Sequence, residues 1–261
     1  MLATPQFSSL EIETDGPVAT VWLNRPNKLN ALSLELLEEI TKAALWFNTN
    51  DNIRSVIIAG RGRAFSAGAD LAGFPEIEGA NVREAADAGR IMADAVESMR
   101  AITIANIHGW CVGGGLVLAA ACDLRIAAAT TKFSIPEIDL GIPLAWGGIP
   151  RLVREIGAAM TKELVMTCRQ FSAAEAKSLG FLNRVVDEPE LGPLARELAD
   201  QICSKPRHAI SSTKQHVNAV SEQMGTGVNA WSDADGLLVG LLDSECQSSR
   251  EAYLKKRDSN S

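Results

Sequence analysis

The sequence predicts an α/β fold that is followed by a helical C-terminal region. Three observations support this prediction: short apolar runs alternate with amphipathic segments of helical spacing, glycine-rich loops join the two, and the pattern becomes almost wholly helical after residue 191. Strands that alternate with helices are typical of a sheet covered by helices. The 261 residues, 46% of them hydrophobic, suffice for one large domain or for one domain with an appendage.

The first hundred residues contain two predicted strand–helix pairs. Residues 18–23 predict a strand, and Ser33 is expected to cap a helix that continues with apolar residues at helical spacing. Residues 55–59 predict a short buried strand that ends at Gly60. Residues 83–99 predict a second helix, because Met92, Ala95, Val96 and Met99 share one face.

The middle of the chain repeats this alternation. Residues 102–107 predict a strand, and Gly113–Gly115 leads into an apolar helix over residues 116–122. Residues 124–127 predict another strand. The alternation supports an α/β core that continues through this part of the chain.

Beyond Gly147 the pattern changes to helices. Residues 150–156 and 158–167 predict helices, and Ser172-Ala-Ala-Glu175 is a capping box for a helix that ends at Gly180. Residues 184–187 predict a last strand, and the tail that follows is expected to break at Pro206 and around residues 225–227. A tail this short would have little stability as a separate domain. This suggests that it takes part in assembly or serves as a lid.

Composition limits the class of protein. A net charge of −7 provides no basic stripe that could neutralise phosphates, so we expect no nucleic-acid partner. The five cysteines contain no C-x-x-C pair and the three histidines are scattered, which favours neither a disulfide framework nor a metal site. The N-terminus lacks the features of a signal peptide, and the apolar runs are too short to span a membrane. We therefore expect a cytoplasmic protein without a membrane partner.

Glu137 is the residue that most clearly indicates chemistry. It lies in the run Thr131-Lys-Phe-Ser-Ile-Pro-Glu-Ile-Asp-Leu-Gly-Ile-Pro143, where a carboxylate has apolar neighbours. A carboxylate is costly to bury in such surroundings unless it is paired or used for proton transfer. The position predicts a general acid or base.

Two loops of small residues lie upstream of Glu137. They are Phe65-Ser-Ala-Gly-Ala-Asp70 and Gly109-Trp-Cys-Val-Gly-Gly-Gly115, and the second leads directly into a predicted helix. Exposed N–H groups at a helix N-terminus favour a phosphate or an enolate oxygen, although glycines also permit close strand–helix packing. The glycines do not have the G-x-G-x-x-G spacing of dinucleotide-binding folds. Together with Glu137, the loops suggest an enzyme that polarises a carbonyl and moves a proton beside it.

Other functional interpretations of these segments have less support. Asp70 is interpreted as a loop anchor that bonds to its own backbone, rather than as a catalytic carboxylate. Ser66 lies outside a G-x-S-x-G elbow and no histidine is placed by motif to activate it, so a serine hydrolase is not favoured. The basic cluster Lys255-Lys-Arg257 fits either a solvated tail or a docking site for a phosphorylated ligand.

Five segments carry a resemblance to a known family. They are, in order, Asn24-Arg-Pro-Asn-Lys-Leu-Asn-Ala-Leu32, Ala64-Phe-Ser-Ala-Gly-Ala-Asp-Leu71, His108-Gly-Trp-Cys-Val-Gly-Gly-Gly115, Cys122-Asp-Leu-Arg-Ile-Ala127 and Phe133-Ser-Ile-Pro-Glu-Ile-Asp-Leu-Gly141. In order and spacing they resemble the signatures of the enoyl-CoA hydratase/isomerase (crotonase) family. The pattern continues in Ala173-x-Glu-Ala-x-x-x-Gly180 and Val185-Val-Asp187, so the resemblance covers nearly the whole chain, although each motif alone is of modest specificity.

The resemblance implies a fold, an assembly and a substrate class. It implies a spiral core of ββα units over residues 1–195, and a helical region over residues 196–261 that packs on neighbouring subunits in trimers or hexamers. It implies an acyl-CoA thioester substrate, with no cofactor other than the coenzyme A of the substrate and no metal. The backbone N–H groups of Ala69 and Gly114 would hold the thioester oxygen as it becomes an enolate.

The chain departs from the family pattern at Val117. Family hydratases have two glutamates, and Glu137 matches the second while Val117 stands where the first would be. One carboxylate suffices to move a double bond by proton transfer, whereas hydration in the family uses two. A Δ3-Δ2-enoyl-CoA isomerase, another specialised acyl-CoA lyase and a non-catalytic acyl-CoA-binding protein are therefore the alternatives. Ala145 replaces the aspartate nucleophile of the family's dehalogenases, which excludes that reaction.

The resemblance also implies positions that contact substrate. Trp146 replaces a small residue and would narrow the acyl pocket or stack on an unsaturated chain, although a core aromatic without ligand contact is an equal alternative. Around coenzyme A the resemblance points to Lys28, Leu29, Ala67, Asp70 and Leu71, and from a neighbouring subunit to Tyr253 and Lys256. The basic C-terminus would then meet phosphate groups.

Overall fold

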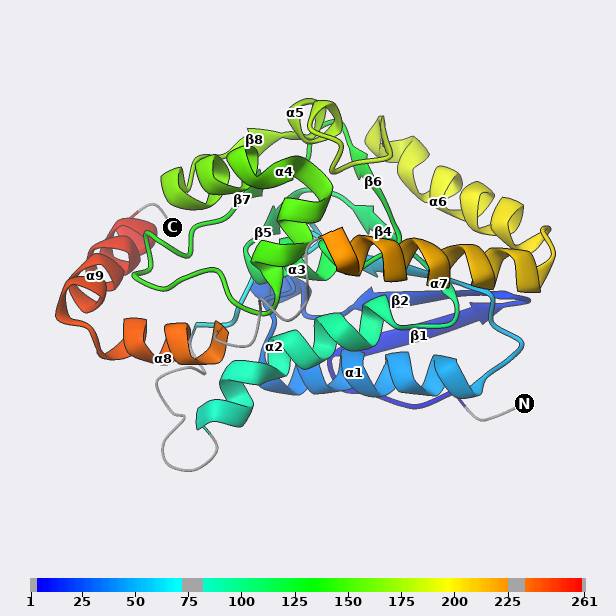
Figure 1. The fold of residues 1–261 in the computed structure, drawn as a ribbon, viewed down its shortest axis with the longest axis horizontal. Helices are drawn as coiled ribbons and strands as arrows, with labels where there is room; N and C mark the ends of the chain where they lie inside the picture. The colour runs from blue at the N-terminus through cyan, green and yellow to red at the C-terminus, as the bar shows by residue number, and fades with distance from the viewer. Residues whose placement is uncertain (1–3, 72–81, 225–232, 260–261) are drawn as a thin grey trace.

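A computed structural model describes residues 4–71, 82–224 and 233–259 and shows an α/β core with a helical C-terminal region (Figure 1). The larger sheet has the strand order β1-β2-β3-β4-β6-β9. Its strands are β1 (Leu10–Asp15), β2 (Val18–Leu23), β3 (Ser55–Gly60), β4 (Ile102–Ile107), β6 (Leu124–Ala128) and β9 (Arg184–Val186). β1 is antiparallel to β2, and the later neighbours pair in parallel. The predicted α/β class is confirmed.

Helices cover both faces of this sheet, and the central strands β3 and β4 are buried along their whole length. Parallel strands in this situation read as continuous apolar runs, as both of these do. One face packs on α6 (Glu188–Cys203) through Leu191, Ala195 and Ala199. The other packs on α1 (Leu34–Thr49), α2 (Val82–Glu97) and α3 (Gly114–Ala120). The loops that leave β3 and β4 therefore emerge side by side at one edge of the sheet.

A second, smaller sheet contains β5 (Trp110–Val112), β7 (Lys132–Ser134) and β8 (Phe171–Ser172). β5 and β7 pair in parallel, and an isolated parallel bridge joins Ser66 to Cys111 of β5. The chain thus repeatedly runs from a strand of the large sheet to a short segment of the small one and then to a helix. This repeat is the spiral of ββα units that the resemblance implied. The sequence analysis did not predict β1 or the three short strands.

Local sequence signals explain where the helices begin and end. The Ser33 hydroxyl accepts a hydrogen bond from the Leu36 N–H and caps α1, and the Ser172 hydroxyl caps α5 (Ala173–Ser178) in the same way through Glu175. The two helices predicted over residues 150–156 and 158–167 are present as the two parts of α4 (Gly148–Thr167), which are separated at Gly157 with a φ of 77°. A left-handed φ favours glycine, which explains the interruption.

The C-terminal region is helical where the structure describes it. After α6 come α7 (Arg207–Met224), α8 (Asp233–Leu242) and α9 (Ser244–Ser259), and the break expected at Pro206 is confirmed. The break expected around residues 225–227 lies outside the described residues. The proposed boundary between residues 195 and 196 falls inside α6 and stays a prediction. Of the helices in the described ranges, none combines the length and apolar character needed to cross a membrane.

Candidate active site

Glu137 lies in the loop after β7, with its carboxylate against the backbone of Gly113. A Cβ at Gly113 would lie only 2.4 Å from the Glu137 Oε1, so only glycine fits at that position. The residue as a whole is partly exposed, but its Oε2 is sealed from solvent and has no hydrogen-bond partner among the described residues. A buried carboxylate oxygen without a partner is available to a ligand.

Burial changes the acidity of this group. Loss of hydration raises the pKa of Glu137 from the ordinary 4.5 to about 7, while a hydrogen bond to backbone lowers it by less. At neutral pH both the acid and its conjugate base are then present in comparable amounts. This is the condition under which one carboxyl group takes up and returns a proton most efficiently.

The two predicted oxyanion donors belong to neighbouring loops. Gly114 opens α3, so its N–H lies in the helix's first turn, where backbone donors have no intrahelical acceptor. Gly68 precedes Ala69, and a Cβ at Gly68 would lie 3.6 Å from the Gly114 nitrogen. Ala69 pairs with Leu32 in a parallel bridge whose hydrogen bonds use the Gly68 carbonyl and the Asp70 N–H. Within the described residues, the Ala69 N–H therefore donates to no backbone carbonyl.

The loop of residues 64–70 is held by the preceding loop of residues 24–32. The buried Asn30 side chain donates to the carbonyls of Arg61 and Ala64, at 2.9 and 2.8 Å, and accepts from the Arg25 N–H. The Ser66 hydroxyl donates to the Asn30 carbonyl and accepts from the Gly68 N–H. The side chains of Asn30 and Ser66 thus form hydrogen bonds with the backbone of both loops. These bonds fix the position of the loop that carries the Ala69 N–H.

Asn30→Ala is expected to destabilise the protein by about 2–3 kcal/mol, because it removes these bonds and leaves buried carbonyls without donors. Urea unfolding measures the loss. Asn27→Ala is the matched control, because Asn27 is exposed in the same loop. Equal effects of the two substitutions would contradict the role assigned to Asn30.

Glu137 and the two donor residues line a small pocket. Its described lining consists of Ala69, Gly114, Glu137, Ile142, Pro143, Leu144, Ala145, Trp146 and Leu237. Glu137 is the one ionisable side chain in this lining. The remainder is apolar, which keeps water away and strengthens any electrostatic interaction with the donors.

Trp146 is a wall of this pocket and contacts the backbone of Gly114. A Cβ at Gly114 would lie 2.1 Å from the ring carbon Cζ3 of Trp146, so the indole packs directly on the predicted donor. Trp146 itself has a φ of 61°, a left-handed conformation that costs a non-glycine residue roughly 1–3 kcal/mol. Trp146 is also part of the buried hydrophobic core, and its contact with a ligand stays a prediction.

Val117 lies beside the pocket but not in its described lining. It is buried in α3. A Cβ built at Gly148 would lie 2.9 Å from the Val117 Cγ2 and 2.9 Å from the Leu144 Cγ, so the two side chains meet there. Its side chain therefore packs on the start of α4 and on a residue of the pocket wall. Valine can neither bond a water molecule nor supply a proton from this position.

Five of the residues expected near coenzyme A come from two loops, residues 24–32 and 64–71, that are hydrogen-bonded to each other. Lys28 is exposed and Leu29 is partly buried, and the Ala67 N–H donates to the Leu29 carbonyl. Asp70 forms an ion pair of 2.8 Å with Arg25, and Leu71 follows it at partial exposure. The ion pair supports the interpretation of Asp70 as a loop anchor, with Arg25 of the adjoining loop as a partner.

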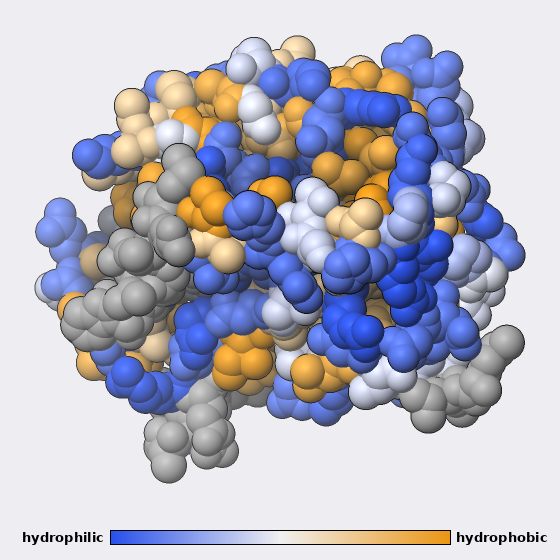
Figure 2. Space-filling model, turned by 45° about the vertical axis from the view of Figure 1, so that its right-hand side comes forward, coloured by the Kyte–Doolittle hydropathy of each residue, from blue (hydrophilic) through white to orange (hydrophobic). Residues whose placement is uncertain are grey.

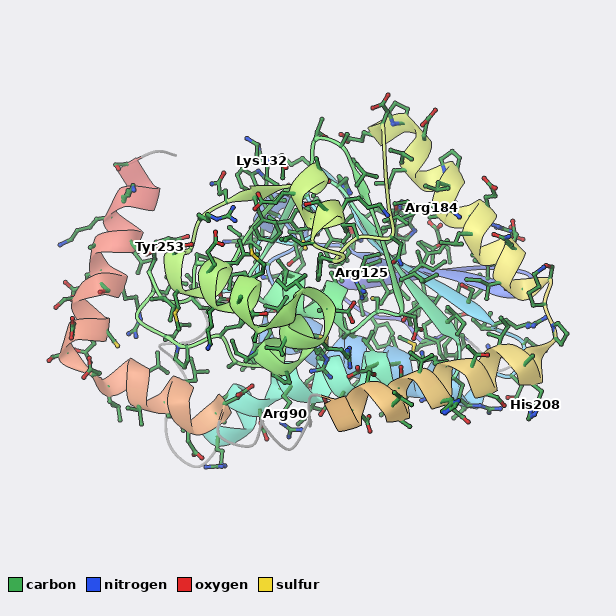
Figure 3. All side chains as sticks on the ribbon, turned by 45° about the horizontal axis from the view of Figure 1, so that its top comes forward. Arg90, Arg125, Lys132, Arg184, His208 and Tyr253 are labelled. Carbon is green, nitrogen blue, oxygen red and sulfur yellow. The ribbon has the colours of Figure 1, made fainter. Side chains whose placement is uncertain are left out.

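Tyr253 (Figure 3) and Lys256 lie on α9, and neither belongs to the described pocket lining. The start of α9 packs on the loop after Glu137, since a Cβ at Gly141 would lie 2.2 Å from the Cys246 carbonyl oxygen. Arg250 donates to the Leu140 carbonyl from the same helix. α9 thus braces the loop of its own chain, and the role of the two residues at a neighbouring subunit stays a prediction.

Sequence reasoning missed several residues that shape the site. Leu237 of α8 lines the pocket, and the Asp233 carboxylate accepts a 2.7 Å hydrogen bond from the Gly147 N–H. Arg151 of α4 donates to the carbonyls of Trp146 and Gly147. No motif identifies these contacts: Leu237 and Asp233 come from a segment far along the chain, and the Arg151 bonds to the nearby turn have no recognisable pattern. Among the described residues, no three His, Cys, Asp or Glu side chains gather as metal ligands would.

Comparisons with known proteins match nearly the whole length of this chain. The family model described as enoyl-CoA hydratase/isomerase matches residues 13–260. A protein named crotonyl-CoA hydratase from Syntrophomonas wolfei is 34% identical over 256 residues, which cover 97% of this chain and 98% of that protein.

Solved structures agree with this result. An enoyl-CoA hydratase from Bacillus anthracis has a TM-score of 0.79 and 34% identity, covering 95% of this chain and 97% of the other. An enoyl-CoA hydratase/isomerase from Xanthobacter autotrophicus has a TM-score of 0.84 and 28% identity, and the match covers 98% of this chain and 99% of the other. Sequence and fold lead to the same conclusion: this chain belongs to the enoyl-CoA hydratase/isomerase family.

Proposed function

We propose that the protein moves the double bond of a 3-enoyl-CoA thioester to the 2-position by proton transfer through Glu137. The observation that carries the proposal is the buried carboxyl group of Glu137, which has a pKa of about 7 and a free Oε2 and lies in an otherwise apolar lining beside two backbone donors. One group with this acidity can serve in turn as base and acid.

In the mechanism Glu137 acts twice, first as a base and then as an acid. The Glu137 carboxylate removes a proton from C2 of the 3-enoyl thioester, and the electron pair moves onto the thioester oxygen to form a dienolate. The N–H groups of Ala69 and Gly114 stabilise the negative charge on that oxygen. The protonated Glu137 then returns the proton to C4, and the double bond forms between C2 and C3. The substrate and the product have the same composition.

Hydration of a 2-enoyl-CoA is the second candidate, and the names of the similar proteins favour it. Addition of water needs a base for the water and an acid for C2. Val117 stands where family hydratases have the glutamate that would work together with Glu137. Glu137 would then have to perform both tasks in one transition state. A non-catalytic acyl-CoA-binding protein is disfavoured, because a binder gains nothing from an unpaired buried carboxylate.

The discriminating experiment supplies trans-2- and cis-3-enoyl-CoAs of several lengths and identifies the products by liquid chromatography with mass spectrometry. We expect cis-3-enoyl-CoA to give the trans-2 isomer at unchanged mass, with hydration slower by at least about tenfold. A product that has gained one water molecule and is formed without any isomer would overturn the proposal in favour of hydration. Binding without any product would favour the non-catalytic alternative.

Coenzyme A is proposed to lie along Lys28, Leu29, Ala67, Asp70 and Leu71, as part of the substrate and without any other cofactor. The exposed Lys28 ammonium can pair with a phosphate group there. A cytoplasmic location also stays a prediction.

We also propose a homotrimer or a hexamer assembled through the C-terminal helices. α7 and α8 expose Val217, Val220, Val239 and Leu242 by 59%, 46%, 67% and 81%. Figure 2 shows one face of the molecule, on which separate apolar patches lie between hydrophilic areas. Large exposed apolar side chains on the C-terminal helices are typical of surfaces that associate.

Light scattering at micromolar concentration is expected to give a mass of about three or six chains. The paired substitution Val239→Ser/Leu242→Ser should shift the equilibrium toward monomer, whereas Leu45→Ser, which alters an exposed side chain of α1, should not. A monomeric wild-type protein would contradict this prediction.

A further inference from the structure

The indole of Trp146 fills a space that two glycines leave open. A Cβ at Gly89 of α2 would lie 2.0 Å from the ring carbon Cδ2, and a Cβ at Gly114 would lie 2.1 Å from Cζ3. A side chain at either position would therefore displace the ring. The indole bridges α2 and the start of α3 and closes the pocket on the α2 side.

Charged groups hold the backbone of Trp146 and Gly147 in this arrangement. Both residues have a left-handed φ, of 61° and 67°. The Arg151 guanidinium donates to the carbonyls of Trp146 and Gly147, at 3.4 and 3.2 Å, and the Asp233 carboxylate accepts from the Gly147 N–H at 2.7 Å. A turn with two consecutive left-handed residues persists only where its surroundings fix it.

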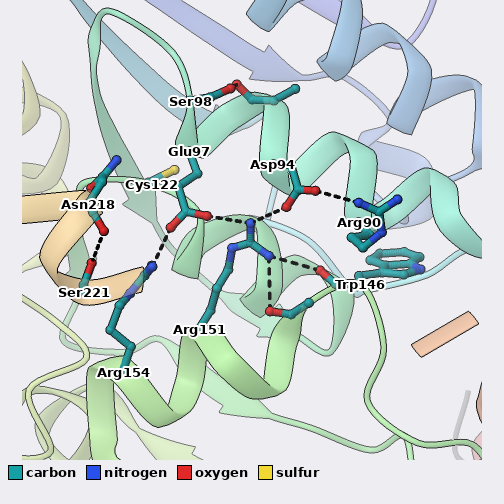
Figure 4. Close-up of polar contacts among 12 residues, drawn as sticks. Arg90, Asp94, Glu97, Ser98, Cys122, Trp146, Arg151, Arg154, Asn218 and Ser221 are labelled. Carbon is teal, nitrogen blue, oxygen red and sulfur yellow. Dashed lines mark hydrogen bonds and ion pairs between the residues drawn. The ribbon is translucent and has the colours of Figure 1, made fainter. Parts of the chain in front are cut away.

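Arg151 is itself held by two carboxylates of α2 (Figure 4). One of its terminal nitrogens contacts Asp94 at 2.8 Å and Glu97 at 2.6 Å, and its side chain is 7% exposed. Asp94 also pairs with Arg90, and Glu97 also pairs with Arg154. The planar guanidinium thus joins α2 to the turn that carries Trp146, which a lysine ammonium cannot do with the same geometry.

We propose that Trp146 determines specificity for short acyl chains, and that Arg151 and Asp233 are positioning residues that hold its indole against Gly89 and Gly114. The proposal rests on the proposed function in that it assumes an acyl-CoA ligand in this pocket. The indole closes the route between α3 and α2, so that the acyl group meets the apolar wall of Pro143, Leu144 and Leu237. This small pocket favours a short acyl chain, and a longer chain needs the indole to move.

The first experiment measures binding, which does not depend on turnover. Butyryl-CoA and octanoyl-CoA are titrated into the wild type, Trp146→Ala and Trp146→Phe by calorimetry. We expect Trp146→Ala to raise the affinity for octanoyl-CoA relative to butyryl-CoA by about tenfold or more, and Trp146→Phe to have a smaller effect. An unchanged ratio in a folded Trp146→Ala variant would overturn the proposal.

The second experiment tests the two positioning residues. Arg151→Met and Asp233→Asn are expected to shift the octanoyl-to-butyryl ratio in the same direction as Trp146→Ala. Arg154→Met and Asp235→Asn are matched controls on the same helices: Arg154 pairs with Glu97 and Glu155, and Asp235 pairs with Arg83 at the surface. Both controls should keep the wild-type ratio.

Fluorine NMR of protein labelled with 5-fluorotryptophan reports on the indole directly. The Trp146 resonance is assigned by its loss in Trp146→Phe, and it should broaden or shift in Arg151→Met and Asp233→Asn but not in the controls. In Arg151→Lys the binding ratio and the Trp146 resonance should lie between those of the wild type and those of Arg151→Met. A sharp, unshifted resonance and a wild-type ratio in both Arg151→Met and Asp233→Asn would overturn the positioning role.

A double-mutant cycle covers the case in which single variants fold poorly. Gly89→Ala should lower the melting temperature when Trp146 is present, because its Cβ meets the ring, and should do so much less when residue 146 is alanine. Equal losses in both backgrounds would overturn the packing of the indole on α2. Failure of the isomerase assay alone would refute the proposed reaction, whereas unaltered binding ratios would refute this inference.

Discussion

Glu137→Gln is expected to lower kcat for cis-3-enoyl-CoA by about 10²–10⁴, with little change in affinity for the substrate. The amide keeps the size and shape of the side chain but can neither accept nor return a proton. Steady-state kinetics with product identification measures the loss, and circular dichroism checks that the variant is folded. Asp139→Asn is the matched control, because Asp139 is exposed in the same loop. Full activity in folded Glu137→Gln would show that another group transfers the proton.

The same substitution should make the protein more stable at alkaline pH. The folded state raises the pKa of Glu137 from 4.5 to about 7, so the folded protein binds this proton more tightly than the unfolded chain does. The stabilisation is fully present below about pH 4.5 and is lost as the pH rises through 7. At about pH 8 Glu137→Gln should therefore gain on the order of 2–3 kcal/mol in unfolding free energy. Denaturant unfolding at about pH 5 and pH 8 tests the sign.

Replacing the Gly114 amide by an ester is expected to lower kcat by about 10²–10³, because it removes one oxyanion donor. The ester is the cleaner change, since proline or alanine at this position would place a Cβ 2.1 Å from the Trp146 ring and disturb the pocket as well. Steady-state kinetics with cis-3-enoyl-CoA measures kcat and KM. The expected KM is nearly unchanged, because the donor gains strength chiefly as negative charge develops.

The matched control is the same ester at Gly115, one residue further along α3. It perturbs the same helix end without removing the proposed donor, so kcat should fall by less than about threefold. An equal loss at both positions would assign the effect to the helix N-terminus as a whole. No loss at Gly114 would remove it from the oxyanion hole.

Much of this fold could be predicted from the sequence because the signals are local. Runs such as residues 55–59 and 102–107 are apolar throughout, as strands buried on both faces must be, and Ser33 and Ser172 mark helix starts through their own hydroxyls. Glu137 and the glycine loops were identified because a carboxylate and bare N–H groups are unusual in apolar surroundings. The short strands 110–112, 132–134 and 171–172 were missed, because two or three residues carry no periodicity.

What only the tertiary structure decided is the environment of these residues. The sequence indicates that Glu137 is unusual, but its pKa depends on how completely the surrounding segments remove water from its carboxyl group. The sequence contains Trp146, Gly89 and Gly114 in separate segments, and only their packing shows that one indole needs both glycines. Likewise, Arg151 and Asp233 look like ordinary surface charges until the fold brings Asp233 to the Gly147 N–H and Arg151 to the carboxylates of α2. Periodicity and capping depend on residues a few positions apart, whereas desolvation and close packing depend on segments that the chain brings together only when it folds.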